Sequence, residues 1–253
     1  MYLTALSTGH CTTKAGQRPV NDRPVLPLVS DRTGRRRWSD LIAMPAGSNS
    51  GTGSTYASPE DNRIRQLGGT LKRLAGDDIR LVQLPNAGAT KAKYEGFMLL
   101  DEAGDIVRAT ALPYRVPKPS EAVFGLPRSF FLSGWHMVLS DSEMSLLLSI
   151  LAHVGIASPW PPELTVQLTG ATRIRFHGLS LDTYSAYKYL AACGILEVIP
   201  DNNRRSDGTF EGQREGMRPL PHQLRVIEKG FDKDALGVVT ATLKGMGTAK
   251  PGA

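Results

Sequence analysis

One stretch of the chain joins a helix signal to a hairpin signal: Ser180-Leu-Asp-Thr-Tyr-Ser-Ala-Tyr-Lys-Tyr-Leu-Ala-Ala-Cys-Gly194, then Ile195-Leu-Glu-Val-Ile-Pro200, then Asp201-Asn-Asn-Arg-Arg-Ser-Asp-Gly208. Ser180 is a good helix N-cap, and Gly194 is a good residue to end the helix. The apolar run that follows predicts a strand, and the polar run after it predicts a turn with Arg204 and Arg205 at its tip. The stretch therefore predicts a capped helix followed by a basic antiparallel hairpin.

The same order occurs nearer the N-terminus. Residues 61–76 predict a helix whose buried stripe recurs at three- and four-residue steps: Ile64, Leu67, Leu71 and Leu74. Strands are predicted at residues 79–84 and 94–100, with Lys91 and Lys93 in the turn between them. The chain therefore contains two predicted copies of a helix followed by a basic hairpin.

Two adjacent glycines, Gly68 and Gly69, lie in the interior of the first of these helices. Each weakens a helix by roughly 1 kcal/mol relative to alanine, because glycine loses the most backbone entropy on folding. Close approach of another backbone, from a neighbouring helix or from DNA, would explain glycine here. Of these two explanations, helix packing is the one we expect.

A helix followed by a hairpin with cations at its tip is the skeleton of a winged helix. In that module the helix enters the major groove and the hairpin contacts flanking phosphates. The predicted fold class is α+β and mainly helical, with tandem winged-helix units and small antiparallel β-hairpins. We expect an N-terminal winged-helix-like unit with a basic arm at residues 1–110 and a connector at 111–125. A C-terminal winged-helix unit would follow at residues 126–232, and a flexible tail at 233–253.

Other segments have local signals. Residues 37–44 predict a short helix, and residues 140–143 have the pattern of a capping box in front of an apolar helix. Residues 173–177 alternate between charged and apolar side chains, which places Arg173 and Arg175 on one face of that segment. Cys193 occupies a core position of the second helix, so we expect a buried thiol.

The composition is that of a soluble globular protein, since 41% of the 253 residues are hydrophobic and 21% are charged. No apolar run approaches the roughly 20 residues that a membrane helix needs, and the N-terminus lacks a secretion signal. Two cysteines are too few for a disulfide scaffold. We therefore expect a cytoplasmic, nucleoid-associated protein with no membrane partner.

The net charge of +6 is unevenly distributed along the chain. Residues 1–120 carry 17 Lys and Arg against 11 Asp and Glu, whereas residues 121–253 carry 13 against 13. Much of the excess comes from a basic N-terminal arm that contains Lys14, Arg18, Arg23, Arg32, Arg35, Arg36 and Arg37. Such an arm suits a polyanionic partner, although similar runs also occur as solvated tails.

Side chains that lie off the apolar stripes, or in the basic turns, are the candidates for DNA contact. Arginine and lysine bind phosphates, and arginine and glutamine suit bidentate contacts with guanine and adenine. Any one of these residues also fits an ordinary solvated surface, so it is their clustering in both copies that favours DNA. The predicted DNA-binding residues are Arg65, Gln66, Lys72, Lys91, Lys93, Arg173, Arg175, Tyr184, Ser185, Lys188, Arg204 and Arg205.

Enzymatic chemistry has little support in the sequence. The five histidines are scattered without an HExxH motif, and Ser133 near His136 lacks a GxSxG elbow. No GxGxxG motif follows a predicted strand. The sequence thus predicts no catalytic residue, no metal site and no cofactor.

The stretch from Ser180 to Gly208 resembles bacterial winged helix-turn-helix DNA-binding proteins. Residues 130–143, 94–97 and 35–38 are similar to segments of helix-turn-helix proteins from actinobacteria and their mobile elements. In all, the resemblance covers about residues 35–228. Two winged-helix units in one chain are also the architecture of plasmid replication initiators.

The resemblance implies a recognition-helix role for Tyr184, Ser185 and Lys188, and a wing role for Arg204 and Arg205. The N-terminal copy departs from the family pattern, because a long Gly/Ser-rich loop would precede its helix. That departure puts DNA reading by the N-terminal copy in doubt, and dimerisation is its other expected role.

Two functions are consistent with these features. The first is sequence-specific binding of double-stranded DNA by a transcriptional regulator or plasmid-type replication initiator, with a homodimer as a further expectation. The alternative is a winged-helix protein-interaction or dimerisation module that does not read DNA directly. Residues 171–218 are nearly neutral, and Tyr184 and Tyr189 are predicted to be exposed, which suits the alternative.

Overall fold

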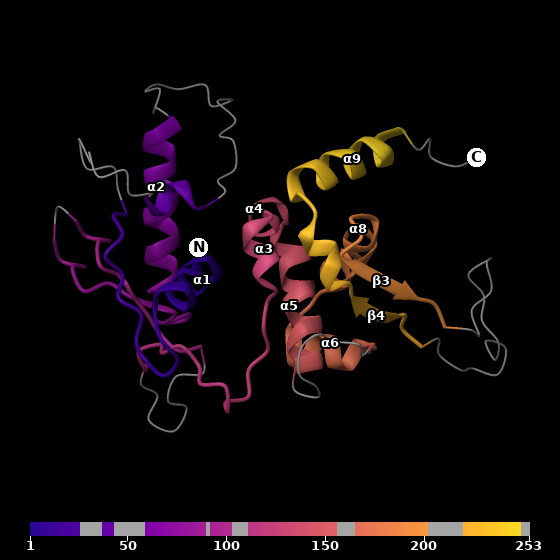
Figure 1. The fold of residues 1–253 in the computed structure, drawn as a ribbon, viewed down its shortest axis with the longest axis horizontal. Helices are drawn as coiled ribbons and strands as arrows, with labels where there is room; N and C mark the ends of the chain where they lie inside the picture. The colour runs from indigo at the N-terminus through magenta and orange to yellow at the C-terminus, as the bar shows by residue number, and fades with distance from the viewer. Residues whose placement is uncertain are drawn as a thin grey trace. The chain divides into compact units, whose positions relative to one another are not determined.

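The computed structural model describes residues 1–25, 37–42, 59–89, 92–102, 111–155, 165–201 and 220–248. The chain divides into two compact units, Met1–Glu121 and Ala122–Ala253 (Figure 1). Helices predominate among the described residues, where each unit has one pair of antiparallel strands. The predicted fold class, α+β and mainly helical with small antiparallel hairpins, is confirmed at this level.

The N-terminal unit is built from two longer helices and a very short hairpin. In chain order its elements are α1 (Tyr2–Thr12), the 3₁₀ helix η1 (Trp38–Asp40), α2 (Pro59–Leu74), β1 (Val82–Gln83) and β2 (Met98–Leu99). Val82 pairs with Leu99 and Gln83 with Met98. The predicted helix at residues 61–76 corresponds to α2. The predicted strands are much shorter than expected, and the helix predicted at 37–44 is a single 3₁₀ turn over its described part.

Side chains from all these elements meet in one core. Leu67 and Leu71 of α2 are fully buried beside Val82 and Phe97, and the Trp38 ring lies 5.3 Å from the Phe97 ring. The boundary of the unit falls inside the predicted connector. Residues 111–121 belong to the N-terminal unit, where Tyr114 is buried and Pro113 bridges to the strand end at Leu100.

One glycine of α2 has a packing role different from the predicted one. A Cβ placed on Gly68 would lie 2.9 Å from Cε2 of Tyr94. An aromatic ring therefore occupies the space above Gly68, not a neighbouring helix backbone as we expected. This contact fixes the hairpin side of the unit against α2.

The C-terminal unit contains most of the helices. Three described helices precede Val166, a residue that pairs with Leu224 in the small sheet: α3 (Arg128–Leu132), α4 (Trp135–Val138) and α5 (Asp141–Gly155). After Val166 come the helices α6 (Gly170–His177), α7 (Leu181–Ser185) and α8 (Tyr187–Ala192), then the strands β3 (Leu196–Ile199) and β4 (Gln223–Val226), and finally the helices η3 (Glu228–Asp232) and α9 (Ala235–Thr248). Trp135, Leu147, Leu190, Leu224 and Phe231 are among the fully buried side chains of their common core.

The predicted capping box in front of α5 is confirmed. The Ser140 backbone N–H donates to Glu143 Oε2 at 2.6 Å, and the Glu143 N–H points back to Ser140 Oγ at 3.5 Å. Each end of the box therefore satisfies a donor that the first helical turn leaves open.

The predicted helix at residues 180–194 is present as two short helices, α7 and α8, that meet at Ala186. The Ala186 N–H donates to Thr183 O at 3.2 Å, a 3₁₀-type bond that tightens the chain at this point. Gly194 has φ +73°, and the N–H of Ile195 reaches Leu190 O at 3.2 Å. This is the glycine-dependent helix end that the sequence predicted.

The ribbon after Gly194 is antiparallel, with Leu196 opposite Val226 and Ile199 opposite Gln223. Its second strand begins at Gln223, whereas the predicted turn ended at residue 208. Val166 adds a one-residue bridge to the ribbon on the side of β4 opposite β3. It exchanges two backbone hydrogen bonds of 2.8 Å with Leu224. The sheet order is therefore Val166, β4, β3.

Two predictions about local structure are wrong. Residues 173–177 form helix α6 and not an alternating segment: Thr169 Oγ1 caps it by accepting from Thr172 N–H, and Gly178 ends it with φ +61°. The tail predicted from residue 233 is helix α9 over Ala235–Thr248, and Ala235 is fully buried. Asp234 caps this helix by accepting from the Gly237 N–H at 2.7 Å.

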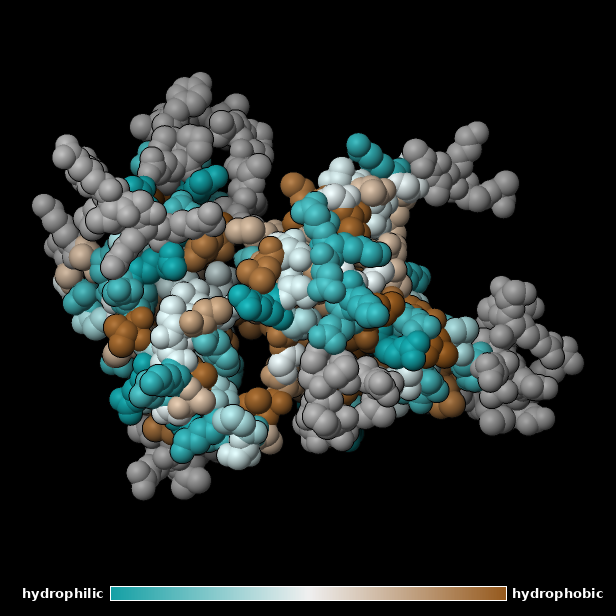
Figure 2. All heavy atoms as spheres, in the orientation of Figure 1, coloured by the Kyte–Doolittle hydropathy of each residue, from teal (hydrophilic) through white to brown (hydrophobic). Residues whose placement is uncertain are grey.

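Hydrophilic and hydrophobic residues are interspersed on the face drawn in Figure 2. In the part of the chain that the structure describes, no helix combines the length and the apolar character needed to cross a membrane.

Candidate nucleic-acid interface

The helix pair α7–α8 exposes two of the predicted recognition residues to solvent. Ser180 Oγ accepts from the Thr183 N–H at 3.0 Å and fixes the start of α7. Leu190 is fully buried, whereas Ser185 and Lys188 are exposed. Ser185 Oγ donates to Asp182 O at 2.6 Å, which leaves its lone pairs free to accept a hydrogen bond. Of the predicted recognition residues, Ser185 and Lys188 therefore have the outward position that DNA contact requires.

Tyr184 lies differently from its predicted outward position. Its ring is half-buried against the core of the C-terminal unit and lies 5.3 Å from the Tyr187 ring. The guanidinium of Arg173 lies over the Tyr184 ring at 5.3 Å. Tyr189 is also half-buried against this core, so neither tyrosine forms the exposed aromatic patch that the sequence suggested.

Arg173 and Arg175 do not share one face, because α6 is a helix and residues two positions apart point about 200° apart. Arg173 is half-buried and donates through Nη1 to Ser180 O at 3.3 Å, which ties α6 to the start of α7. Arg175 is exposed. The predicted common face of the two arginines is therefore wrong, and Arg175 is the one left on the surface.

The tip of the ribbon lies outside the described residues, and with it the predicted wing residues Arg204 and Arg205. Within the described strands, Arg225 of β4 forms an ion pair with Glu197 of β3, with Nε 2.8 Å from Oε2. The cation of β4 is thus neutralised across the ribbon. Any excess positive charge on this element must come from the segment between the strands.

In the N-terminal unit, the outward face of α2 collects polar and cationic side chains. Arg65 and Lys72 are exposed and lie on the same side of the helix, since seven residues complete almost two turns. Gln66 is half-exposed beside them. Arg73 forms an exposed ion pair with Asp78 at 3.0 Å, a contact of the kind that contributes little to stability. The structure thus brings the predicted residues Arg65, Gln66 and Lys72 together on one surface.

The predicted turn lysines of this unit are only partly described. Lys91 lies outside the described residues. Lys93 is half-buried, with its Nζ 5.9 Å from the centre of the Tyr94 ring. Because Tyr94 itself lies on Gly68 of α2, Lys93 is held close to the α2 helix.

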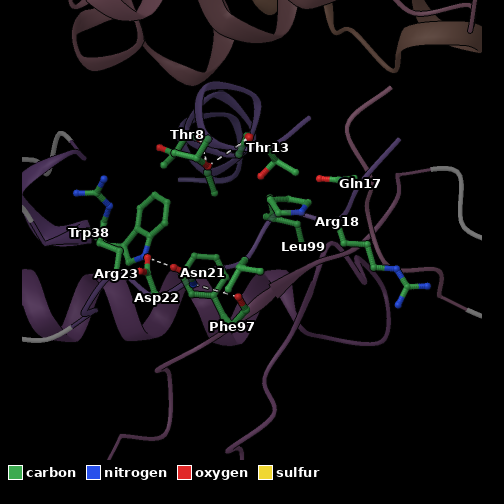
Figure 3. A pocket seen from close by; sticks show the side chains of 15 residues that line it. Thr8, Thr13, Gln17, Arg18, Asn21, Asp22, Arg23, Trp38, Phe97 and Leu99 are labelled. Carbon is green, nitrogen blue, oxygen red and sulfur yellow. Dashed lines mark hydrogen bonds between the residues drawn. The ribbon is translucent and has the colours of Figure 1, made fainter. Parts of the chain in front are cut away.

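A cavity of about 410 Å³ lies in the N-terminal unit between α1, the segment that follows it and β2 (Figure 3). Asn21 forms part of its wall: its Oδ1 accepts from Trp38 Nε1 and its Nδ2 donates to Phe97 O, both at 3.0 Å. Two arginines of the basic arm line the cavity, and Arg23 stacks over the Trp38 ring at 5.5 Å. Part of the arm is therefore folded onto this unit.

Two histidines approach each other where the ends of α5 and α6 meet. The rings of His153 and His177 are 5.8 Å apart, and burial together with His153 lowers the pKa of His177. Within the described ranges, no group of three or more His, Cys, Asp or Glu side chains could hold a metal ion. Cys193 is buried as predicted, and burial raises the pKa of its thiol.

The sequence reasoning missed two features of this region. Residues 165–169 alternate between polar and apolar, with Val166 and Leu168 buried, and this signal could have predicted the third strand position. The exposed apolar side chains of α6 and α7 were also missed, including Ile174, Phe176 and Leu181. Ile174 and Phe176 alternate with charged residues, a pattern typical of the buried face of a strand, so the sequence predicts burial of these two side chains and not their exposure.

Comparison with protein-family models, with curated proteins and with solved structures finds no match to this chain.

Proposed function

We propose that this chain binds double-stranded DNA and that its C-terminal unit acts as a winged helix. The observation that carries the proposal is the order of elements in that unit: α5, Val166, α6, α7 with α8, β3 and β4. A winged helix has this order of helices and strands, with the last strand in the middle of its small sheet. The antiparallel ribbon directly after α8 supports the same assignment.

In this arrangement the α7–α8 pair is the recognition helix. Ser185 and Lys188 would contact base edges or phosphates in the major groove, since both are exposed on one side of the pair. Arg204 and Arg205 would contact phosphates beside the groove from the ribbon. Arg173 would act indirectly, by holding α6 against the start of α7 through Ser180.

The proposed role is that of a transcriptional regulator or a plasmid-type replication initiator of the bacterial winged helix-turn-helix class, acting at the nucleoid without a catalytic step. The basic first half of the chain supports a polyanionic partner. A homodimer is part of the proposal, because two-fold symmetric sites are the common targets of such proteins.

The test is the binding of a fluorescein-labelled mixed-sequence duplex at low salt, followed by fluorescence anisotropy. Replacing Lys188, Arg204 and Arg205 together by alanine should weaken binding by at least about a hundredfold, since three charge-assisted contacts would be lost. The matched control replaces Arg128, Lys229 and Lys244, three exposed residues elsewhere in the unit, and so removes the same charge. Equal loss in both triple variants would mean that net charge alone controls binding, against the proposed interface.

A second function is favoured by one observation on α6 and α7. Phe176 is 79% exposed, Leu181 69% and Ile174 62%, so three large apolar side chains of two consecutive helices are accessible to a partner. An interaction or dimerisation module would bury these residues against another protein. Cations and acids are also balanced in the second half of the chain, which suits that function.

The two functions respond differently to one substitution. Phe176→Ser should leave duplex affinity unchanged if the C-terminal unit is a DNA-binding module that acts through α8. If the unit is instead a dimerisation module, the wild type should sediment as a dimer that Phe176→Ser converts to a monomer, with no duplex binding by either protein. Sedimentation velocity and anisotropy on the same samples separate these outcomes.

A further inference from the structure

The cavity of the N-terminal unit is bordered by an ordered loop that contains no helix or strand, residues 13–25. Loops of this length without regular structure are uncommon in compact units and are usually functional. The loop is fixed near its start, because the Gly16 N–H donates to Val116 O at 2.7 Å. Asn21 fixes its middle by donating from Nδ2 to Phe97 O at 3.0 Å.

The loop also packs directly on α1. A Cβ placed on Gly9 would lie 2.9 Å from Pro19 Cβ, so a larger residue at position 9 would push the loop away. The end of the loop is held by the Glu95 carboxylate, which accepts from the Val25 N–H at 3.0 Å. These contacts fix the walls of the cavity, and a site with fixed walls loses less entropy on binding.

The cavity has the size and the mixed lining of a small-molecule site. All fifteen residues that line it belong to the described part of the chain. Its volume of about 410 Å³ falls within the range of roughly 300–1,000 Å³ that is typical of ligand pockets. Apolar side chains such as Phe97 and Leu99 share the lining with polar ones such as Thr8 and Gln17. Such a lining can cover the body of a ligand and also fix its orientation.

The polar side chains of the interior determine which hydrogen bonds a ligand can form. Figure 3 shows Thr8 and Gln17 on one side of the cavity and Asn21 on the other. Thr8 Oγ1 donates to Thr4 O at 2.9 Å, and Thr12 Oγ1 donates to Thr8 O at 3.0 Å. Because each hydroxyl uses its hydrogen within α1, it offers only lone pairs to a ligand, whereas the Gln17 amide can donate and accept. The interior therefore suits a molecule that carries O–H or N–H donors.

The charge of the lining is positive and lies at the ends of the cavity. Arg18 and Arg23 lie at opposite ends in Figure 3, and the fifteen lining residues contain one acid, Asp22. Arg23 is held over the Trp38 ring, whereas Arg18 is exposed and forms no ion pair within the described ranges. The Arg18 guanidinium points away from the interior (Figure 3), where the charged end of a bound molecule would emerge. A guanidinium binds a phosphate through two parallel hydrogen bonds.

We propose that the cavity binds a small organic phosphate whose body carries hydroxyl or amine hydrogens. The body lies between α1 and the loop, where Thr8 and Thr12 accept its hydrogen bonds, and the phosphate lies outside at Arg18. A mononucleotide and a sugar phosphate share this chemistry. The site is independent of the proposed recognition helix, because it uses no residue of the C-terminal unit.

The test follows the indole resonances of the full chain labelled with ¹⁵N-tryptophan. Trp38 Nε1–H donates to Asn21 Oδ1 in the cavity wall, whereas Trp135 Nε1–H donates to Phe231 O in the C-terminal unit. The probes are adenosine monophosphate and ribose 5-phosphate, each compared with its neutral counterpart, adenosine or ribose. At least one phosphate should shift the Trp38 resonance with saturation and leave the Trp135 resonance unchanged. Its neutral counterpart should bind at least about tenfold more weakly, since the charge-assisted contact with Arg18 is lost.

Two variants locate the site. Arg18→Gln should weaken binding of the same phosphate by about tenfold. Thr12→Phe places a large side chain at an exposed position of the α1 wall and should abolish the Trp38 shift by filling the cavity. The matched control, Arg128→Gln, removes an exposed arginine of the C-terminal unit and should leave the affinity at the wild-type value.

The absence of a saturable Trp38 shift with either phosphate at about 10 mM would overturn the inference. Equal affinity for a phosphate and its neutral counterpart would overturn it as well, and so would wild-type affinity in either Arg18→Gln or Thr12→Phe. None of these results bears on duplex binding by the C-terminal unit.

Discussion

Single glycines in this chain differ in what occupies the space next to them. Gly230, in η3, is buried against the end of α8: a Cβ there would lie 2.3 Å from Gly194 O and 3.0 Å from Ile195 Cα. Both contacts are with backbone, so a side chain cannot be accommodated by rotation. The start of the ribbon is held in place by this approach.

We predict that Gly230→Ala destabilises the protein by about 1–3 kcal/mol, the usual range for forcing an extra carbon into a packed site. Urea unfolding followed by circular dichroism measures the change. Gly245→Ala, at an open helical position, should be neutral or stabilising in the same assay. A Gly230→Ala protein as stable as the wild type would show that the end of α8 is not packed as described.

The pKa of His177 gives a prediction for pH dependence. Burial, with a smaller effect of His153, lowers this pKa below its ordinary value of 6.5. The folded state then binds fewer protons than the unfolded chain, so the free energy of unfolding decreases as the pH falls. The stability that neutral His177 contributes is fully present above pH 6.5. It is lost as the pH falls through the lower pKa of the folded state.

His177→Gln should therefore flatten the decrease in stability between about pH 7.5 and 5. Burial also lowers the pKa of His10 in the N-terminal unit, but His10 is present in both proteins and cancels in the comparison. Urea unfolding at several pH values gives the measurement. Parallel curves for the two proteins would mean that His177 titrates equally in the folded and unfolded states.

At the scale of elements, α9 depends on one side chain at its start. Asp234 Oδ2 accepts from the Gly237 N–H at 2.7 Å, and Ala235 is fully buried in the core directly after it. Removing the cap by Asp234→Ala should cost about 1 kcal/mol, whereas Asp234→Asn should cost little because asparagine caps as well. Thermal unfolding compares the two variants; equal losses would point to the charge of Asp234 and not to its hydrogen bond.

Elements with a strong local signal were predicted from sequence, and elements defined by a few long-range contacts were not. The α2 stripe, the capping box at Ser140 and the glycine that ends α8 all act within one or two helical turns. The bridge between Val166 and Leu224 joins residues far apart in the chain, so the alternation of residues 165–169 can indicate a strand there but cannot specify its partner. Helix α9 was missed because its several glycines argue against a helix. The N-cap residue Asp234, directly before it, is a helix-start signal that was overlooked.

The candidate surface was predicted less well than the fold. Exposure of Lys188 and Arg65 follows from helical periodicity, and both predictions hold. Tyr184 is half-buried against the core with Arg173 over its ring, a contact between two helices that spacing alone cannot reveal. The alternation of residues 173–177 was misleading, since period-two patterns also arise by chance in a short helix such as α6.

At the scale of the whole molecule, charge and architecture are divided between the two units. The first half of the chain carries the cationic excess, and the second half contains the order of helices and strands on which the proposed winged helix rests. Under the proposed function, the first half would supply much of the attraction for a polyanion, and the second half would recognise the groove.

The most direct test of DNA binding is the salt dependence of duplex affinity. About six phosphate contacts imply a slope near −5 when the logarithm of the binding constant is plotted against the logarithm of salt concentration. The account predicts this slope for the wild type, and a slope shallower by about 3 when Lys188, Arg204 and Arg205 are replaced by alanine. No binding at low salt, or the same slope in both proteins, would contradict it.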